Sequence, residues 1–187
     1  MAQYRRYYRH GGSFFFTVVT ARRARILTSE LGRACLRSAL HECLARFPFR
    51  LNAIVLLPDH LHAIWTLPHD DEDFSKRWGY IKKTFTQLYL RRGGRESPVS
   101  SSQSSERRRG IWQRRFWEHL IRDELDFERH FDYVHYNPVK HALVSRPRDW
   151  PFSTFHRWVA QGHYQPNWGA ETQGPLCFED IEETATE

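Results

Sequence analysis

The amino-acid sequence predicts an α+β fold of ferredoxin-like type, in which a βαββαβ order of elements, followed by one more helix, builds one antiparallel sheet. Four short stretches rich in aromatic and β-branched residues predict strands, and three longer stretches with apolar residues at helical spacing predict helices. Two of the strands flank a turn dipeptide, which predicts a hairpin. Short connections between these elements then predict a single sheet with helices on both faces.

The first strand is predicted over residues 13–20 (SFFFTVVT), which follow a Gly-Gly break. The first helix begins at Ser29 and follows the pattern SELGRACLRSALHECLARF. The hairpin comes next, with residues 50–57 (RLNAIVLL) and 60–67 (HLHAIWTL) on either side of Pro58-Asp59. Both of its strands are largely apolar, so we expect each to be buried on two faces.

The second half of the sequence supplies the remaining helices and strand. Residues 74–92 predict a second helix with an apolar face and a basic face, and residues 116–122 predict a short strand. A third helix is predicted over residues 124–136. It is expected to stop near Asn137, because the residue before Pro138 is disfavoured in the α region. This helix should cover the sheet face that the first two leave open.

Charge and aromatic content exclude a disordered protein and favour a polyanionic partner. The chain has 187 residues, with 28 Lys and Arg, 22 Asp and Glu, and 15% aromatic residues. Six acidic residues and no basic ones lie in residues 171–187, so the rest of the chain carries 28 basic and 16 acidic side chains. Tyr and Trp interleaved with arginines suit nucleic acid better than a lipid surface, although a solvated basic surface is the alternative.

We predict one domain over residues 1–169, with a basic N-terminal arm and an aromatic tail (DWPFSTFHRWV) packed on the body. Residues 93–110 are rich in Ser and Arg and are expected to form a mobile loop, and residues 170–187 an acidic, flexible C-terminus. No apolar run approaches the roughly 20 residues of a membrane span, and the start lacks a cleavable signal. Reduced thiols are expected at Cys35, Cys43 and Cys177.

Two histidines predict a metal site. His60 and His62 flank Leu61 in a strand, so both imidazoles lie on one face of the sheet. Imidazole is a good ligand for divalent first-row metals, and an oxygen ligand should complete the set. Tyr133 and Asn137 are four residues apart and share a face of the third helix, which would bring a phenol and an amide oxygen to the imidazoles.

Simpler explanations exist for each of these residues taken alone. A strand histidine is more often packed or exposed than bound to metal, Tyr133 could be a core tyrosine, and Asn137 could simply end a helix. Taken together, they could polarise a phosphodiester while a phenol attacks phosphorus and remains attached as a phosphotyrosine. Hydrolysis by water, which leaves no protein attached to the DNA, is another possibility.

Three segments, LPDHLHAIW, FWEHLIRDELDFERHFDYVHYNPVKHALV and DWPFSTFHRW, together resemble the REP-associated tyrosine transposases, relatives of the single-tyrosine HUH transposases of bacterial insertion sequences. REP denotes a repetitive extragenic palindrome, and HUH denotes two histidines around a hydrophobic residue. The resemblance runs from about Tyr4 to Trp168. It implies an HUH nuclease fold, cleavage of single-stranded DNA at or near REP hairpins through a 5′-phosphotyrosine, and a divalent metal ion, Mg²⁺ or Mn²⁺.

The resemblance also implies roles for individual residues. The metal-binding histidine pair falls on His60 and His62, the nucleophile on Tyr133, and the third metal ligand on Asn137. Tyr136 lies three residues after Tyr133 and could compete for the nucleophile role. Residues 93–110 look longer than the family requires.

Two basic groups have the composition that single-stranded DNA binding needs, although either could be solvated surface. They comprise Tyr4, Arg5, Arg6 and Tyr7 in the arm, and Lys82, Lys83, Arg114 and Arg115 in the body. We therefore expect a cytoplasmic, nucleoid-associated bacterial endonuclease and strand transferase, with no membrane partner and a monomer favoured over a homodimer. The alternative is a protein that binds DNA hairpins without cutting them.

Overall fold

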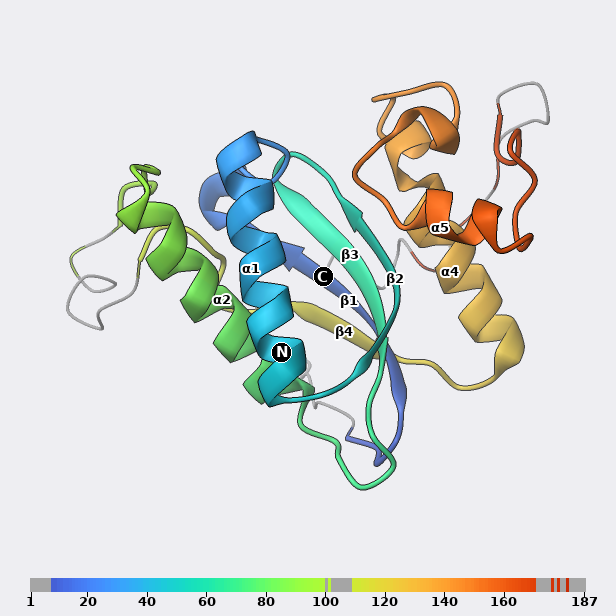
Figure 1. The fold of residues 1–187 in the computed structure, drawn as a ribbon, viewed down its shortest axis with the longest axis horizontal. Coiled ribbons are helices and arrows are strands. Elements are labelled where there is room, and N and C mark those ends of the chain that lie inside the picture. Colours follow the sequence, from blue (N-terminus) through green and yellow to red (C-terminus); the bar gives the residue numbers. More distant parts are fainter. Residues whose placement is uncertain are drawn as a thin grey trace, which may run out of the picture.

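Four antiparallel strands form one sheet in the order β2-β3-β1-β4 (Figure 1). They are β1 (Ser13–Val19), β2 (Arg50–Leu56), β3 (His60–Thr66) and β4 (Trp117–Leu120). The structure is a computed structural model that describes residues 8–99, 101, 109–170, 176, 178 and 181. Its strand order confirms the predicted ferredoxin-like sheet.

The predicted hairpin joins β2 to β3 at one edge of the sheet. The turn at Pro58 and Asp59 is closed by a hydrogen bond from Leu57 N to His60 O at 2.9 Å, and Leu56 lies opposite Leu61. The pairing shifts between Leu51 and Ala53, which marks an irregularity in β2. His60 is therefore the first residue of β3, beside the tight turn.

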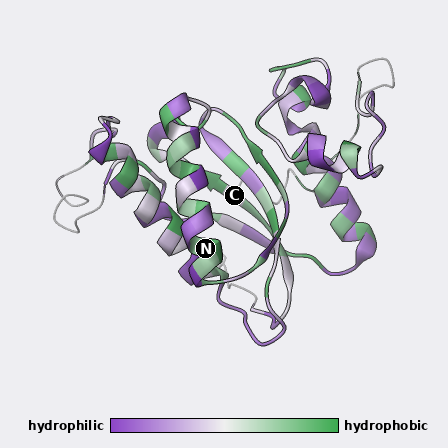
Figure 2. Ribbon diagram, in the orientation of Figure 1, coloured by the Kyte–Doolittle hydropathy of each residue, from purple (hydrophilic) through white to green (hydrophobic). Residues whose placement is uncertain are grey.

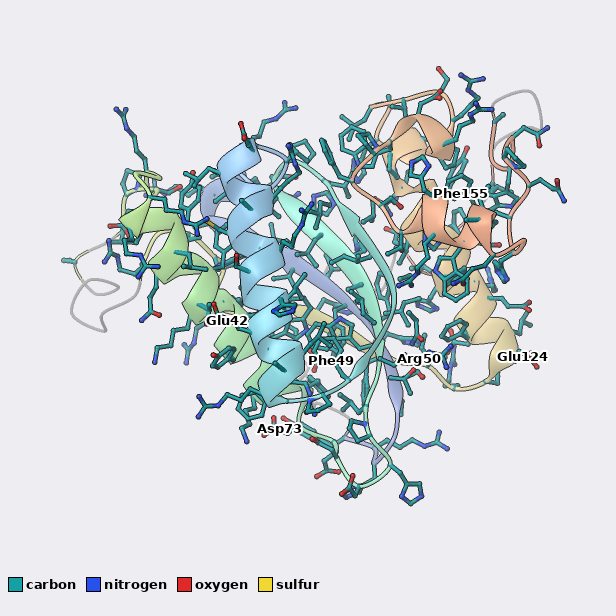
Figure 3. All side chains as sticks on the ribbon, in the orientation of Figure 1. Glu42, Phe49, Arg50, Asp73, Glu124 and Phe155 are labelled. Carbon is teal, nitrogen blue, oxygen red and sulfur yellow. The ribbon has the colours of Figure 1, made fainter. Side chains whose placement is uncertain are left out.

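Helices α1 (Glu30–Arg46) and α2 (Phe74–Arg91) cover one face of the sheet (Figure 1). Ser29 caps α1 by accepting from Gly32 N at 3.0 Å. Asp73 lies at the start of α2 (Figure 3) and caps this helix by accepting from Lys76 N at 2.8 Å. Side chains that point from β1 and β3 into this face include Phe16 and Trp65, and Trp65 stacks on Trp78 with ring centres 4.3 Å apart. Each helix also carries hydrophilic residues (Figure 2).

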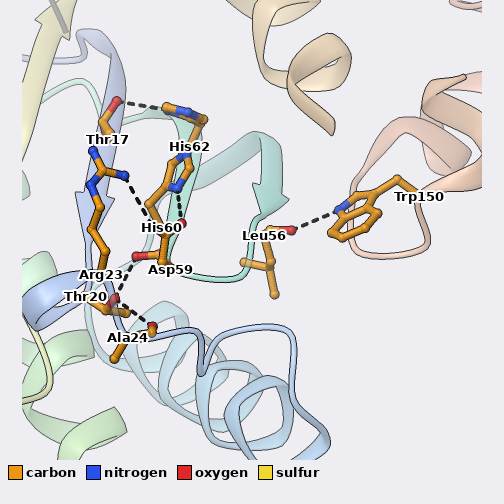
Figure 4. A network of polar contacts seen from close by, with 9 residues as sticks. All are labelled: Thr17, Thr20, Arg23, Ala24, Leu56, Asp59, His60, His62 and Trp150. Carbon is orange, nitrogen blue, oxygen red and sulfur yellow. Dashed lines mark hydrogen bonds and ion pairs between the residues drawn. The ribbon is translucent and has the colours of Figure 1, made fainter. Parts of the chain in front are cut away.

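Helix α4 (Glu124–Lys140) covers the opposite face, as predicted for the last helix. The aromatic tail follows it through two short helices, η2 (Pro147–Asp149) and α5 (Phe155–Ala160). Phe155 is fully buried, and Trp150 donates from Nε1 to Leu56 O at 2.9 Å (Figure 4). The prediction that this tail packs on the body is confirmed.

The predicted end of the third helix is wrong. The helix continues through Pro138 to Lys140, where Asn137 O accepts from His141 N at 3.0 Å and Pro138 O accepts from Leu143 N at 2.9 Å. Proline removes one backbone donor but leaves its carbonyl free to accept, and the buried Asn137 and Pro138 hold the last turn against the sheet. Lys140 is consequently part of the same helix as Tyr133.

Within the segment predicted to form an acidic, flexible C-terminus, the described residues Phe178 and Ile181 are buried. The Phe178 ring lies 5.4 Å from the Tyr133 ring and 5.8 Å from the Tyr136 ring, centre to centre. Cys35 and Cys43 are buried free thiols, as predicted, whereas Cys177 lies outside the described residues. None of the helices in the described part of the chain is long and apolar enough to cross a membrane.

Candidate active site

The two histidines of β3 point toward the face that α4 covers, and each is held through its Nδ1 atom (Figure 4). His60 Nδ1 lies 2.7 Å from Asp59 Oδ1, and His62 Nδ1 lies 2.9 Å from Thr17 Oγ1 on β1. The ring centres are 5.0 Å apart. An imidazole that is bonded through Nδ1 presents Nε2 to a ligand, which is how second-shell groups orient metal-binding histidines.

Both imidazoles are held in their neutral form, which is the form that coordinates metal. Burial lowers the pKa of His60, although the neighbouring Asp59 carboxylate opposes this. Burial also lowers the pKa of His62 well below its usual value, and electrostatic coupling to His60, His141 and Lys140 lowers it further.

Asn137 supplies an oxygen atom at the same place. Its Nδ2 donates to Tyr133 O at 3.3 Å, and its side chain reaches His62, which partly offsets the lowering of the His62 pKa. Oδ1 is buried and makes no hydrogen bond of good geometry with the described residues. A buried oxygen without a partner costs free energy, so two imidazole nitrogens and this oxygen fit a divalent metal ion.

Tyr133 lies one helical turn before Asn137, with its ring centre 5.3 Å from that of His62. Its side chain is only 4% exposed. Lys140 donates from Nζ to the phenol oxygen at 3.2 Å. The structure thus brings together all four predicted site residues, His60, His62, Tyr133 and Asn137.

Sequence reasoning missed the residues that support this group. The sequence carried a signal for Lys140, which lies two helical turns after Tyr133, and for Asp59, which directly precedes His60. No sequence signal identifies Thr17, because only the pairing of β1 with β3 places it opposite His62.

A second set of ligand-type side chains lies where β4 meets the start of α4. Atoms of His119, Asp126 and His130 lie within 4.8 Å of one another and could hold a metal ion. The Asp126 carboxylate already accepts from His119, Arg122 N and Arg122 Nε at 2.8 to 3.2 Å. His130 Nδ1 bonds the Asp126 backbone carbonyl at 2.8 Å and lies 3.0 Å from Asp126 Oδ1. The bonds from His119 and Arg122 also act on the pKa of this carboxylate. These bonds outweigh burial and lower the Asp126 pKa to about 2, so this carboxylate is better satisfied than Asn137 Oδ1.

Two of the predicted DNA-binding residues, Lys82 and Arg114, line a hollow with a volume of about 450 Å³. Arg22, Arg109 and Trp112 line it too, and its lining contains no acidic residue, so we call it the basic hollow. Lys83 and Arg115 are exposed outside this lining. Tyr4, Arg5, Arg6 and Tyr7 lie outside the described residues.

Both the sequence and the fold have relatives among known proteins. The REP-associated tyrosine transposase of Escherichia coli K12 is 45% identical over 172 residues, which cover 91% of this chain and 93% of the relative. This chain belongs to the REP-associated tyrosine transposases. A Haemophilus influenzae protein named as a candidate member is 42% identical over 175 residues, covering 90% of this chain and 94% of its own.

The fold of this transposase also matches a solved structure of the family. A REP-associated tyrosine transposase bound to a REP hairpin superposes with a TM-score of 0.73 at 46% identity, covering 90% of this chain and 91% of that chain. A scan against protein-family models found no match.

Proposed function

We propose that this transposase is a metal-dependent endonuclease and strand transferase for single-stranded DNA, which acts on REP hairpins through a covalent 5′-phosphotyrosine at Tyr133. The observation that carries the proposal is the convergence of a phenol, two neutral imidazoles and a buried amide oxygen without a partner. The relative that was solved with a REP hairpin supports the choice of substrate.

His60, His62 and Asn137 would hold the metal ion, and Asp59 and Thr17 would orient the two imidazoles. When bound, the ion supplies Lewis-acid polarisation of a phosphodiester oxygen. The N,N,O donor set suits Mn²⁺ better than Mg²⁺, which prefers oxygen ligands.

The Tyr133 oxygen attacks phosphorus, and the bond from phosphorus to the 3′ oxygen of the preceding nucleotide breaks. The phenol proton ends on the released 3′-hydroxyl, and the 5′ phosphate remains on Tyr133. A free 3′-hydroxyl can reverse the step, which makes strand transfer possible without a nucleotide cofactor. Lys140 donates to the attacking oxygen and orients it.

Basic residues would bind the phosphates of the DNA. Lys82 and Arg114 line the basic hollow, and Lys83, Arg115 and the arm residues Tyr4, Arg5, Arg6 and Tyr7 extend the binding surface. We place the protein at the nucleoid in the bacterial cytoplasm because this substrate is chromosomal DNA. We propose a monomer, since the α5 tail packs on α4.

One observation favours a second candidate function, binding without cleavage. Tyr133 is 4% exposed, and the Phe178 ring packs against it, so a phosphate reaches the phenol only after side chains move. If Phe178 still covered Tyr133 when DNA was bound, the protein would bind hairpins without cutting them.

Labelled REP hairpins incubated with Mn²⁺, Mg²⁺ or EDTA and run on denaturing gels separate these functions. We expect a metal-dependent protein–DNA adduct that is absent in Tyr133→Phe and retained in the matched control Tyr136→Phe, with hairpin binding retained in both. An adduct that persists in Tyr133→Phe would contradict the assignment of the nucleophile. Binding without adduct or cleavage in either metal would favour the second candidate, and cleavage without adduct would indicate hydrolysis by water.

A further inference from the structure

The turn after β1 contains two adjacent residues in a strained backbone conformation. In η1 (Ala21–Arg23), Arg22 has φ 52° and ψ 27°, and Arg23 has φ 51°. L-residues rarely adopt this left-handed region, which glycine adopts freely. Strain of this kind persists when the surrounding structure enforces it, and it is concentrated at functional sites.

One side of this turn is bonded to the residue that orients His60 (Figure 4). Thr20 N donates to Asp59 O at 2.9 Å, and Thr20 Oγ1 lies 2.8 Å from the same oxygen. Arg23 Nη1 donates to Asp59 Oδ2 at 3.3 Å, while the other carboxylate oxygen, Oδ1, bonds His60 Nδ1. Arg23, Asp59 and His60 therefore form a series of polar contacts that runs from the turn to the candidate metal site.

The other side of the turn reaches the basic hollow. Ala21 N donates to Ile111 O at 2.9 Å, and Gln113 N donates to Val19 O at 3.0 Å, so the turn is joined to the segment that carries Arg114. Arg22 lines the hollow and is exposed. Among the described residues, no side chain accepts a hydrogen bond or forms an ion pair with its guanidinium, which leaves it available to an anion.

We propose that the two adjacent arginines of this strained turn have different roles. Arg22 binds a phosphate of the DNA in the basic hollow, and Arg23 is a positioning residue that holds Asp59, and through it the metal ligand His60. The proposal rests on the proposed function, because it needs DNA in the hollow and a metal ion at His60. Its physical basis is that consecutive residues in the left-handed conformation direct their side chains to different places.

Three glycine substitutions within four residues test this inference. Arg22→Gly and Arg23→Gly remove a guanidinium while relieving backbone strain, so both variants should fold at least as well as the parent. Arg25→Gly removes an exposed charge from the same segment, outside both the hollow and the Asp59 contacts, and is the matched control. Thermal unfolding of the three variants checks that each is folded.

Two measurements separate the two tasks. Hairpin affinity is measured in EDTA at several salt concentrations, and Mn²⁺ affinity is measured by calorimetry without DNA. Arg22→Gly should weaken hairpin binding about threefold to tenfold and reduce the salt slope by about one, with unchanged Mn²⁺ affinity. Arg23→Gly should weaken Mn²⁺ binding about threefold, because Arg23 is largely exposed, with unchanged hairpin affinity, and Arg23→Lys should restore part of the loss.

Parental behaviour of Arg22→Gly in hairpin binding, or of Arg23→Gly in Mn²⁺ binding, would overturn the inference. So would equal losses in the Arg25→Gly control. Failure of the proposed function looks different, because the parent protein itself would then bind no Mn²⁺ or no hairpin.

Discussion

Lys140 contacts Tyr133 at the phenol oxygen, the atom that would react. The ammonium lies 3.2 Å from the phenol oxygen and 4.9 Å from the ring centre, so it meets the side chain that we propose as nucleophile at the atom that would react. A donor placed at a reacting oxygen is effective because it is already oriented when charge develops. Lys140 is therefore a candidate catalytic residue.

Replacing Lys140 tests this role. Lys140→Met should slow adduct formation by about 10- to 100-fold, because the hydrogen bond to the Tyr133 oxygen is lost, and Lys140→Arg should retain part of the rate. Single-turnover kinetics on a saturating REP hairpin measure the effect. Arg37→Met, which removes a charge from the exposed side of α1, should react like the parent. An unchanged rate in Lys140→Met would exclude the role.

At the scale of elements, Asp126 joins β4 to the first turn of the helix that carries Tyr133. Its carboxylate accepts from His119 on β4 and from Arg122 N and Nε in the connection, and Oδ1 lies 3.0 Å from His130 Nδ1, one turn along α4. These contacts bridge the strand and the helix. We infer that this cluster serves mainly to hold α4 on the sheet, since a guanidinium beside the carboxylate disfavours a bound cation.

Asp126→Ala should therefore lower the free energy of unfolding by about 2–3 kcal/mol, because His119 and Arg122 N lose their acceptor and the buried His130 loses its carboxylate neighbour. Asp123→Ala, which removes only the cap of α4, should cost about 1 kcal/mol. Urea unfolding measures both. A loss in Asp126→Ala no larger than that in Asp123→Ala would contradict the bridging role. Stabilisation by Mn²⁺ in a variant that lacks His60 and His62 would instead show that the second cluster binds metal.

At the scale of the whole molecule, the sheet separates two hydrophobic clusters of different character. The cluster under α1 and α2 is dominated by apolar and aromatic side chains, whereas the cluster under α4 and α5 lies beside buried imidazoles. His135 is fully buried, bonded through Nδ1 to Phe131 O and through Nε2 to Thr154 Oγ1. Burial lowers its pKa to about 3.

Stability should consequently fall as the pH is lowered from 7 to 5. In this window the unfolded chain binds protons at its histidines, whose usual pKa is about 6.5. The buried His135, with a pKa of about 3, stays neutral, and the lowered pKa values of His60 and His62 act in the same direction. The unfolded state therefore binds more protons, and His135 alone should contribute a loss of about 2 kcal/mol. The lowered pKa of Asp126, about 2, keeps that carboxylate charged throughout this range.

Urea unfolding in EDTA at pH 7, 6 and 5 measures this dependence. His135→Gln should flatten it, because an amide takes up no proton in this range and can still form hydrogen bonds. A stability that is constant or rises toward pH 5 would contradict the prediction.

Local patterns in the sequence determined the order of strands and helices, the hairpin at Pro58 and Asp59, and the placement of His60 and His62 on one face of a strand. The spacing of Tyr133 and Asn137 determined that they share a helix face. These inferences succeeded because side-chain periodicity and turn chemistry depend on residues close together in the chain. The prediction that the helix ends before Pro138 failed, because packing against the sheet outweighed the tendency of the residue before a proline to avoid the α conformation.

Only the tertiary structure decided what surrounds these residues. Strand register places Thr17 opposite His62, burial brings Phe178 onto Tyr133, and the contacts of Asp59 hold Arg23 in its strained turn. Each contact joins residues far apart in the chain, so its existence depends on how whole elements pack and not on any local pattern. The candidate ligands and nucleophile could be read from the sequence for this reason, whereas an orienting group on another element, such as Thr17, could not.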